Sequence, residues 1–163
     1  MIAKHHTFKT QIMSRGFTLI EILVTLVVLS IGLLGLAGLQ LNGLKSNHSA
    51  YLRSQATILT LDIVDRMRTN RTSAITGAYD IGLGDDPAQA TCEGAGSNCS
   101  SAALAGADLF EWKDLLDDSL PQGDGSISRT ALGGGNTLIT IIVQWDDSKG
   151  QDDPVQLKTE TLI

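Results

Sequence analysis

Residues 17–39 read FTLIEILVTLVVLSIGLLGLAGL and contain one charged side chain, that of Glu21. A helix of about 20 predominantly apolar residues is long enough to cross the hydrocarbon core of a bilayer. The stretch therefore predicts a single transmembrane helix close to the N-terminus of this chain of 163 residues.

The residues before this helix, 1–16, are basic. They contain Lys4, Lys9 and Arg15 and no acidic residue, and the next basic residue along the chain is Lys45. Because the cytoplasmic flanks of membrane helices are enriched in Lys and Arg, we expect the N-terminus to stay in the cytoplasm. The bulk of the chain would then cross outward.

The exported part is predicted to be acidic. Three of the 12 Lys and Arg residues lie in 1–16, which leaves nine against 18 Asp and Glu residues. A nucleic-acid interface needs a basic face that neutralises phosphates. The composition therefore argues against nucleic acid as a partner.

The leader is not an ordinary secretory signal peptide, in which the small-residue cleavage site follows a short apolar core. Here the small residue, Gly16, precedes the apolar run. Cutting after Gly16 would leave the helix on the mature protein, so leader and anchor are different segments. Met13 offers a second possible start of translation and gives the same mature chain.

Residues 15–21, Arg-Gly-Phe-Thr-Leu-Ile-Glu, resemble the cleavage and methylation motif of type IV prepilins and pseudopilins. The resemblance implies cleavage between Gly16 and Phe17 by a prepilin peptidase. It also implies N-methylation of the new amino group of Phe17.

The acidic residue of this motif is expected to act in assembly. An acid at membrane depth costs about 2.5–3.5 kcal/mol on insertion scales, and the first apolar turns offer Glu21 no partner. The Phe17 amino group of the same or a neighbouring subunit could pair with it. The alternative is an acid without a role, solvated at the interface.

The helix is predicted to continue far beyond the membrane, because no proline occurs from Phe17 to Arg71. Residues 40–71 change to an amphipathic pattern, in which apolar side chains recur at spacings of three and four. We interpret this part as a stalk that packs against a globular head. Its apolar stripe consists of Leu52, Ala56, Leu59, Ile63 and Met67.

Glycines recur every three residues in the membrane part, at Gly32, Gly35 and Gly38. Small residues allow helices to pack closely in a membrane. Each glycine also weakens a helix by about 1 kcal/mol relative to alanine, so the stretch could loosen when a subunit leaves the lipid. Both interpretations stay open.

Residues 72–163 are predicted to form the head, which begins with a long irregular connection over 72–101. This connection contains the two cysteines of the chain, Cys92 and Cys99. An even pair in an oxidising compartment indicates one disulfide; the alternative is two unpaired thiols. A zinc site would need further ligands, and the one histidine after the leader, His48, lies far away on the stalk.

The remainder of the head predicts one helix and three strands. The helix covers 108–120, with Asp108 as its cap and Glu111 at the reciprocal position of a capping box. The strands are expected at 126–132, 136–145 and 155–162. Three antiparallel strands packed on the stalk helix give an α+β, pilin-like fold.

No arrangement of residues indicates an enzyme. The chain has no nucleophile with a nearby base and no Gly-Lys phosphate loop, and we expect no cofactor and no metal. Four acids suggest a calcium site, but a solvated hairpin tip fits them better, because the full calcium-loop pattern is missing. The four acids are Asp146, Asp147, Asp152 and Asp153.

Residues 29–40, 47–71 and 144–147 resemble the PilV-type minor pilins of type IV pili. This resemblance implies a structural subunit that helps initiate or cap pilus assembly. Its location would be the inner membrane, as a single-pass protein with a periplasmic head, and then the pilus on the cell surface. The implied partners are the prepilin peptidase, other minor pilins, the major pilin, the inner-membrane assembly platform and membrane lipid.

Three other interpretations stay open. A minor pseudopilin of a type II secretion system shares the same N-terminal motif. A tip adhesin would need an exposed aromatic groove, and aromatic residues make up only 4% of the chain. A generic single-pass anchored protein would leave the arrangement from Gly16 to Glu21 without a reason.

Overall fold

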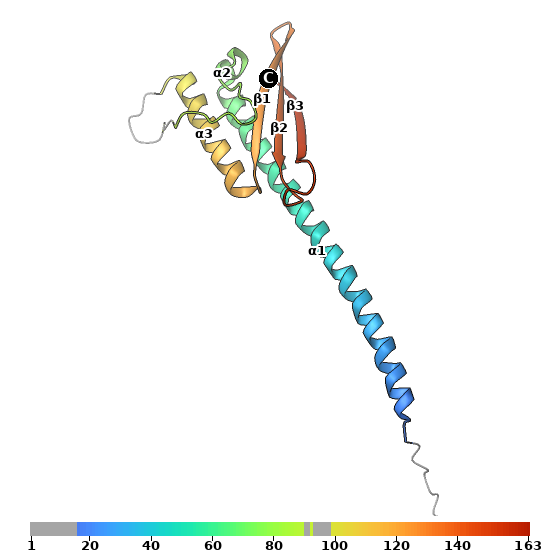
Figure 1. Ribbon diagram of the computed structural model, residues 1–163. Coiled ribbons are helices and arrows are strands. Elements are labelled where there is room, and N and C mark those ends of the chain that lie inside the picture. The colour runs from blue at the N-terminus through green and yellow to red at the C-terminus, as the bar shows by residue number, and fades with distance from the viewer. Residues whose placement is uncertain (1–15, 90–91, 93–98) are drawn as a thin grey trace, which may run out of the picture. The chain divides into compact units, whose positions relative to one another are not determined.

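The computed structural model describes residues 16–89, 92 and 99–163. The chain forms two compact units, residues 1–44 and 45–163. Figure 1 labels the elements along the chain. In order they are α1 Leu19–Thr69, α2 Arg71–Thr76, α3 Ser101–Ser119, β1 Asp124–Gly133, β2 Asn136–Trp145 and β3 Val155–Leu162.

The described part of the first unit is the apolar half of α1 with the three residues that precede it. Every residue from Gly16 to Leu44 is exposed. Among the described residues, α1 is the one helix that is long and apolar enough to cross a membrane. A helix that is apolar on all sides must be covered by protein or by lipid, and none of the described residues of this unit covers it.

The second unit contains the amphipathic half of α1. The five apolar residues predicted to form its stripe are all buried, and Thr60 and Val64 are buried beside them. The prediction of a long helix with an apolar and an amphipathic part is confirmed.

The helix ends two residues earlier than expected, at Thr69. Asn70 leaves the helical conformation, with φ −110° and ψ 47°. Its side-chain amide donates to the carbonyl of Ser101 at 2.7 Å. The chain then forms α2, where an irregular connection was expected, and Gly77 ends this helix in the left-handed conformation, with φ 92°.

The predicted start of the head helix, at Asp108, is wrong. Helix α3 begins at Ser101, and its N-cap is Ser100, whose hydroxyl accepts a hydrogen bond from the amide of Ala103 at 3.2 Å. Residues 102–107 are mostly alanine, which favours helix. Asp108 is therefore an interior residue of α3, and it is buried.

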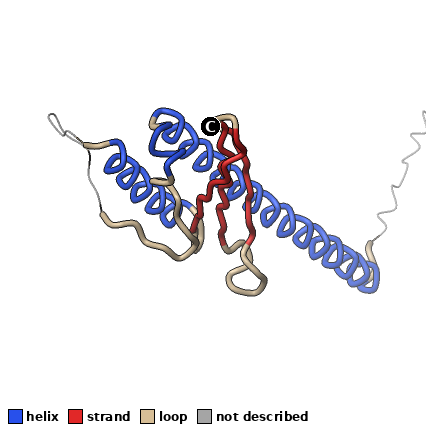
Figure 2. Tube along the Cα trace, turned by 90° about the horizontal axis from the view of Figure 1, so that it is seen from above, coloured by secondary structure: helices blue, strands red, loops and turns tan. Residues whose placement is uncertain are grey.

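The sheet has the predicted strands and is antiparallel throughout, in the order β1-β2-β3. Strands β2 and β3 have the expected bounds, and β1 begins two residues earlier than expected. Gly134 and Gly135 connect β1 to β2 with φ of 63° and 81°. A two-residue hairpin loop of type I′ needs positive φ at both of its residues, which favours glycine. Figure 2 shows the three strands side by side.

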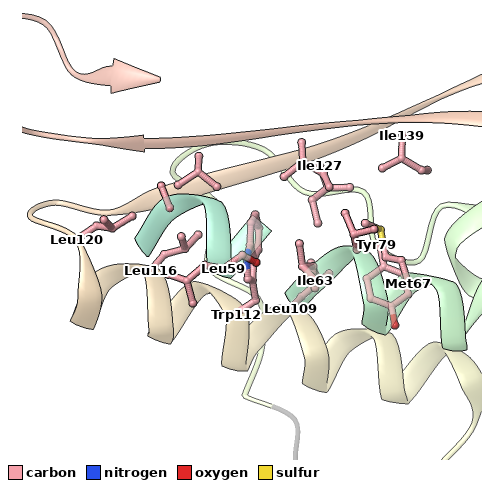
Figure 3. Packing of buried hydrophobic residues seen from close by; sticks show 14 of the residues in the cluster. Leu59, Ile63, Met67, Tyr79, Leu109, Trp112, Leu116, Leu120, Ile127 and Ile139 are labelled. Atoms are coloured by element: carbon pink, nitrogen blue, oxygen red, sulfur yellow. The ribbon is translucent and has the colours of Figure 1, made fainter. Parts of the chain in front are cut away.

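The core lies between the helices and one face of the sheet. Alternate residues of β2 are buried, as expected for a strand with one covered face. In Figure 3 Ile127 of β1 and Ile139 of β2 point toward α1 and α3, which contribute Ile63, Met67 and Trp112. These contacts confirm the α+β, pilin-like fold.

Trp112 fixes α3 against α1 by a hydrogen bond as well as by packing. Its side chain is completely buried, and its indole N–H donates to the carbonyl of Leu59 at 3.0 Å. A buried tryptophan N–H normally needs a partner. This bond provides that partner, and it fixes the position of α3 along the axis of α1.

Candidate processing and assembly site

The predicted cleavage site lies immediately before α1. Gly16, Phe17 and Thr18 are not helical, and the helix begins at Leu19. Within a helix each carbonyl accepts a hydrogen bond from the amide four residues later. The peptide bond between Gly16 and Phe17 is outside this pattern and exposed.

Thr18 occupies the N-cap position of α1. Its hydroxyl accepts a hydrogen bond from the amide of Glu21 at 3.3 Å, and its carbonyl accepts from the amides of Glu21 and Ile22 at 3.1 and 3.3 Å. Threonine is a preferred N-cap residue, because its oxygen satisfies one of the helix amides that lack an intrahelical partner.

Glu21 is the third residue of the helix, the position at which Glu follows Ser or Thr in a capping box. An acid in the first turn also interacts favourably with the helix dipole. The role expected for Glu21 concerned assembly alone and did not include this place at the helix start. The signal, Thr-x-x-Glu over 18–21, was present.

Phe17 and Glu21 lie close together on the helix surface. Both line one groove along the start of α1, together with Ile22, Thr25 and Leu26. In the described part of the chain no ion pair includes Glu21. In the uncut chain the nitrogen of Phe17 is a neutral amide, so its charge would exist only after cleavage.

Cys92 and Cys99 are joined in a disulfide, with their Cα atoms 5.9 Å apart. Residues 93–98 between them lie outside the described residues. The disulfide belongs to the second unit and therefore to the head, not to the processing site. It closes a short loop in the connection from α2 to α3.

A polar network anchors both ends of that connection. The Tyr79 hydroxyl donates to the Asp108 carboxylate and accepts from the side-chain amide of Asn70. Burial and the bond to Asp108 raise the pKa of Tyr79, so it stays a neutral donor. Because Asn70 also binds Ser101, the end of α1, the turn after α2 and the start of α3 are linked.

Arg66 extends the same network toward the solvent. Its guanidinium lies 2.6 Å from the Glu111 carboxylate, 2.8 Å from that of Asp62 and 3.4 Å from that of Asp108. The hydrogen bond to Glu111 contributes most to raising the pKa of Arg66, and the same bond lowers the pKa of Glu111. Glu111, predicted to complete a capping box, instead pairs across to α1.

An ion pair between Lys113 and Asp124, called the clamp below, joins α3 to the start of β1. The Lys113 ammonium pairs with the Asp124 carboxylate and donates to the carbonyl of Gly82 at 3.3 Å, while the Gly84 amide donates to Asp124 at 2.7 Å. Burial acts to raise the pKa of Asp124. The bonds from Lys113, Gly84 and Gly125 outweigh it and hold that pKa below its ordinary value.

Asp124→Asn should lower the stability of the head by about 3 kcal/mol at pH 7, because it removes the carboxylate partner of the largely buried Lys113 ammonium and leaves it with the carbonyl of Gly82. The folded pKa of Asp124 lies below its unfolded value, so the stabilisation is present at neutral pH and is lost as the pH falls through the folded pKa. Urea unfolding of the full chain in detergent should show the difference shrinking below about pH 4.

Glu160→Gln is the matched control. It removes an ion pair with Lys158 in which both side chains are about half exposed, and such pairs contribute about 0–1 kcal/mol. Equal losses in the two variants would show that the clamp of Lys113 and Asp124 carries no particular stability.

The four acids that suggested a calcium site lie in the turn from β2 to β3. The Asp146 carboxylate accepts from the Ser148 amide at 2.8 Å and from its hydroxyl at 3.0 Å. The amide of Ser148 contributes most to lowering the pKa of Asp146. This carboxylate organises the turn itself. In the described ranges no group of three or more possible metal ligands comes together.

Two family models match this chain, and the boundary between the two matches lies within α1. Residues 13–37 match the prokaryotic N-terminal methylation motif, and residues 38–110 match the family described as type IV pilin Tt1218. The chain carries a type IV pilin domain. No curated protein matches it, and no solved structure does.

The pilin match covers the amphipathic half of α1, all of α2 and α3 as far as Phe110, while the methylation motif includes Gly16, Phe17 and Glu21. Type IV pilins are structural proteins. The motif implies processing by a prepilin peptidase and assembly into pili, and the apolar helix fits membrane anchoring.

Proposed function

We propose that this chain is a minor pilin of the type IV pilus, of the PilV kind, which helps initiate or cap pilus assembly. The observation that carries the proposal is the exposed apolar half of α1, which begins within the methylation motif matched over residues 13–37. An apolar surface of this length needs lipid or other subunits to cover it.

The proposal assigns a role to each segment. Residues 1–16 are a leader that the peptidase removes, and 17–39 anchor the mature subunit in the inner membrane. Residues 40–71 form the stalk, and 72–163 the periplasmic head. After extraction from the membrane, the apolar helix is covered by the helices of other minor pilins and of the major pilin.

Two features favour the PilV kind over a pseudopilin. One is the glycine-rich second half of the apolar run, and the other is the end of β2, Gln-Trp-Asp-Asp over 144–147. A minor pseudopilin of type II secretion has the same N-terminal motif and is the second candidate. Deleting the gene should abolish surface pili and leave secretion of folded proteins unchanged; the reverse result would favour the pseudopilin.

Mass spectrometry of the protein from membranes and from sheared pili tests the processing directly. We expect a mature N-terminus at Phe17 that carries one added methyl group. The reason is that cleavage at this bond leaves the whole apolar helix on the mature chain, as an anchored subunit requires. A mature N-terminus after Leu39 would contradict the pilin assignment, because the anchor would be lost.

A further inference from the structure

The residues around the start of α1 contain two independent signals for the place where the helix begins. Thr18 is the N-cap, and its hydroxyl accepts from the Glu21 amide at 3.3 Å. Phe17 and Ile22 stand at the positions of a hydrophobic staple, one before the cap and four after it. Both side chains line the same groove.

These signals select one helix start over a competing one. The nearest upstream residue of an N-cap type is Ser14. If the helix began there, Arg15, Gly16 and Phe17 would form its first turn, and the bond between Gly16 and Phe17 would be part of the helix. The cap and the staple stabilise the later start, at Leu19.

We infer that Thr18 is a positioning residue for cleavage, which keeps the peptide bond between Gly16 and Phe17 outside the helix and open to the peptidase. This inference rests on the proposed function. In the reaction, water adds across that bond, which yields the carboxylate of Gly16 and the amine of Phe17. Thr18 takes no part in the bond changes and acts through the conformation of the substrate.

The test compares two variants of the full-length precursor in detergent, incubated with purified prepilin peptidase. Thr18→Ala should be cut about fivefold more slowly than the unaltered chain, a factor typical of a lost N-cap. Thr18→Ser keeps the hydroxyl and should be cut at close to the normal rate. The processed fraction is followed by mass, which also reports the position of the cut.

Ser30→Ala is the matched control. The Ser30 hydroxyl donates to the carbonyl of Leu26 at 2.7 Å, so this variant loses a hydroxyl from the same helix, outside the groove, without removing a cap. It should be cut normally. A loss equal to that of Thr18→Ala would overturn the inference, since the effect would then follow from any change in this part of the helix.

The double variant Ser14→Ala, Thr18→Ala separates conformation from direct recognition by the peptidase. With both caps removed the helix should fray, the bond should leave the helix, and the cleavage rate should recover. No recovery, or a slow Thr18→Ser variant, would overturn the inference. An unaltered chain that is not cut at all would contradict the proposed function itself, and the inference with it.

Discussion

Gly16→Val should leave the chain uncut, as a precursor that retains residues 1–16 in the membrane. The physical reason lies in the peptidase and not in the pilin. A Cβ added at Gly16 would meet no atom within 4 Å, and the residue precedes the first residue of α1. Valine is therefore tolerated by the fold, while a branched side chain beside the scissile bond crowds the peptidase site.

Immunoblots of membrane fractions and the intact mass of the protein measure this result, and mature protein should be undetectable. Gly43→Val is the matched control, because Gly43 lies in α1, far from the bond, and an added Cβ there also meets no atom within 4 Å. That variant should mature completely. Normal maturation of Gly16→Val would show that the cut does not require glycine.

The parts of the fold that follow from local periodicity could be predicted from the sequence. The apolar half of α1 is defined by composition alone, and the stripe that begins at Leu52 repeats every three or four residues. In strand β2 every second residue is buried, and the residues between are partly buried or, at the first position, exposed. In each case the side chains that form the pattern are neighbours along the chain.

The beginning of α3 was mispredicted because the residue that looked like a cap has a distant partner. Asp108 accepts a hydrogen bond from Tyr79, 29 residues away, and lies near Arg66, 42 residues away. An aspartate before a run of apolar residues usually caps a helix by local bonds. Here tertiary contacts make it an interior residue, while Ser100 provides the cap.

The methylation motif was easier to recognise than the head, because its residues lie in one short segment. Gly16, Phe17 and Glu21 are identified by their resemblance to the prepilin motif, and their roles stay predictions. The cap at Thr18 could have been predicted from Thr-x-x-Glu over 18–21. The clamp of Lys113 and Asp124 could not be predicted, because its geometry depends on Gly84, which lies 40 residues before Asp124. No sequence pattern specifies a contact of that range.

Glu21→Leu and Glu21→Gln should both block pilus assembly while leaving insertion and cleavage intact. Removing the acid makes the helix more apolar, so Leu gains about 2.5–3.5 kcal/mol on insertion scales. The hydroxyl of Thr18 binds the backbone amide of residue 21, which both variants keep. Processing after Gly16 should therefore continue, and mature protein should accumulate in the membrane.

The two variants differ in which function of Glu21 they retain. Gln can replace Glu in a capping box but has no charge, whereas Leu removes both properties. If pairing of Glu21 with the Phe17 amino group drives assembly, both variants fail, because docking would leave that ammonium unpaired in an environment of low dielectric constant. If helix capping were the function that matters, Gln alone would support pili.

Complementation of a deletion strain distinguishes these outcomes, scored by surface pili, twitching and the size of the species retained in the membrane. We expect few or no pili from either variant and a membrane species of mature size. Normal piliation with Glu21→Leu would mean that the acid has no role in assembly. A species of precursor size would place its role at cleavage, where the exposed bond between Gly16 and Phe17 meets the peptidase.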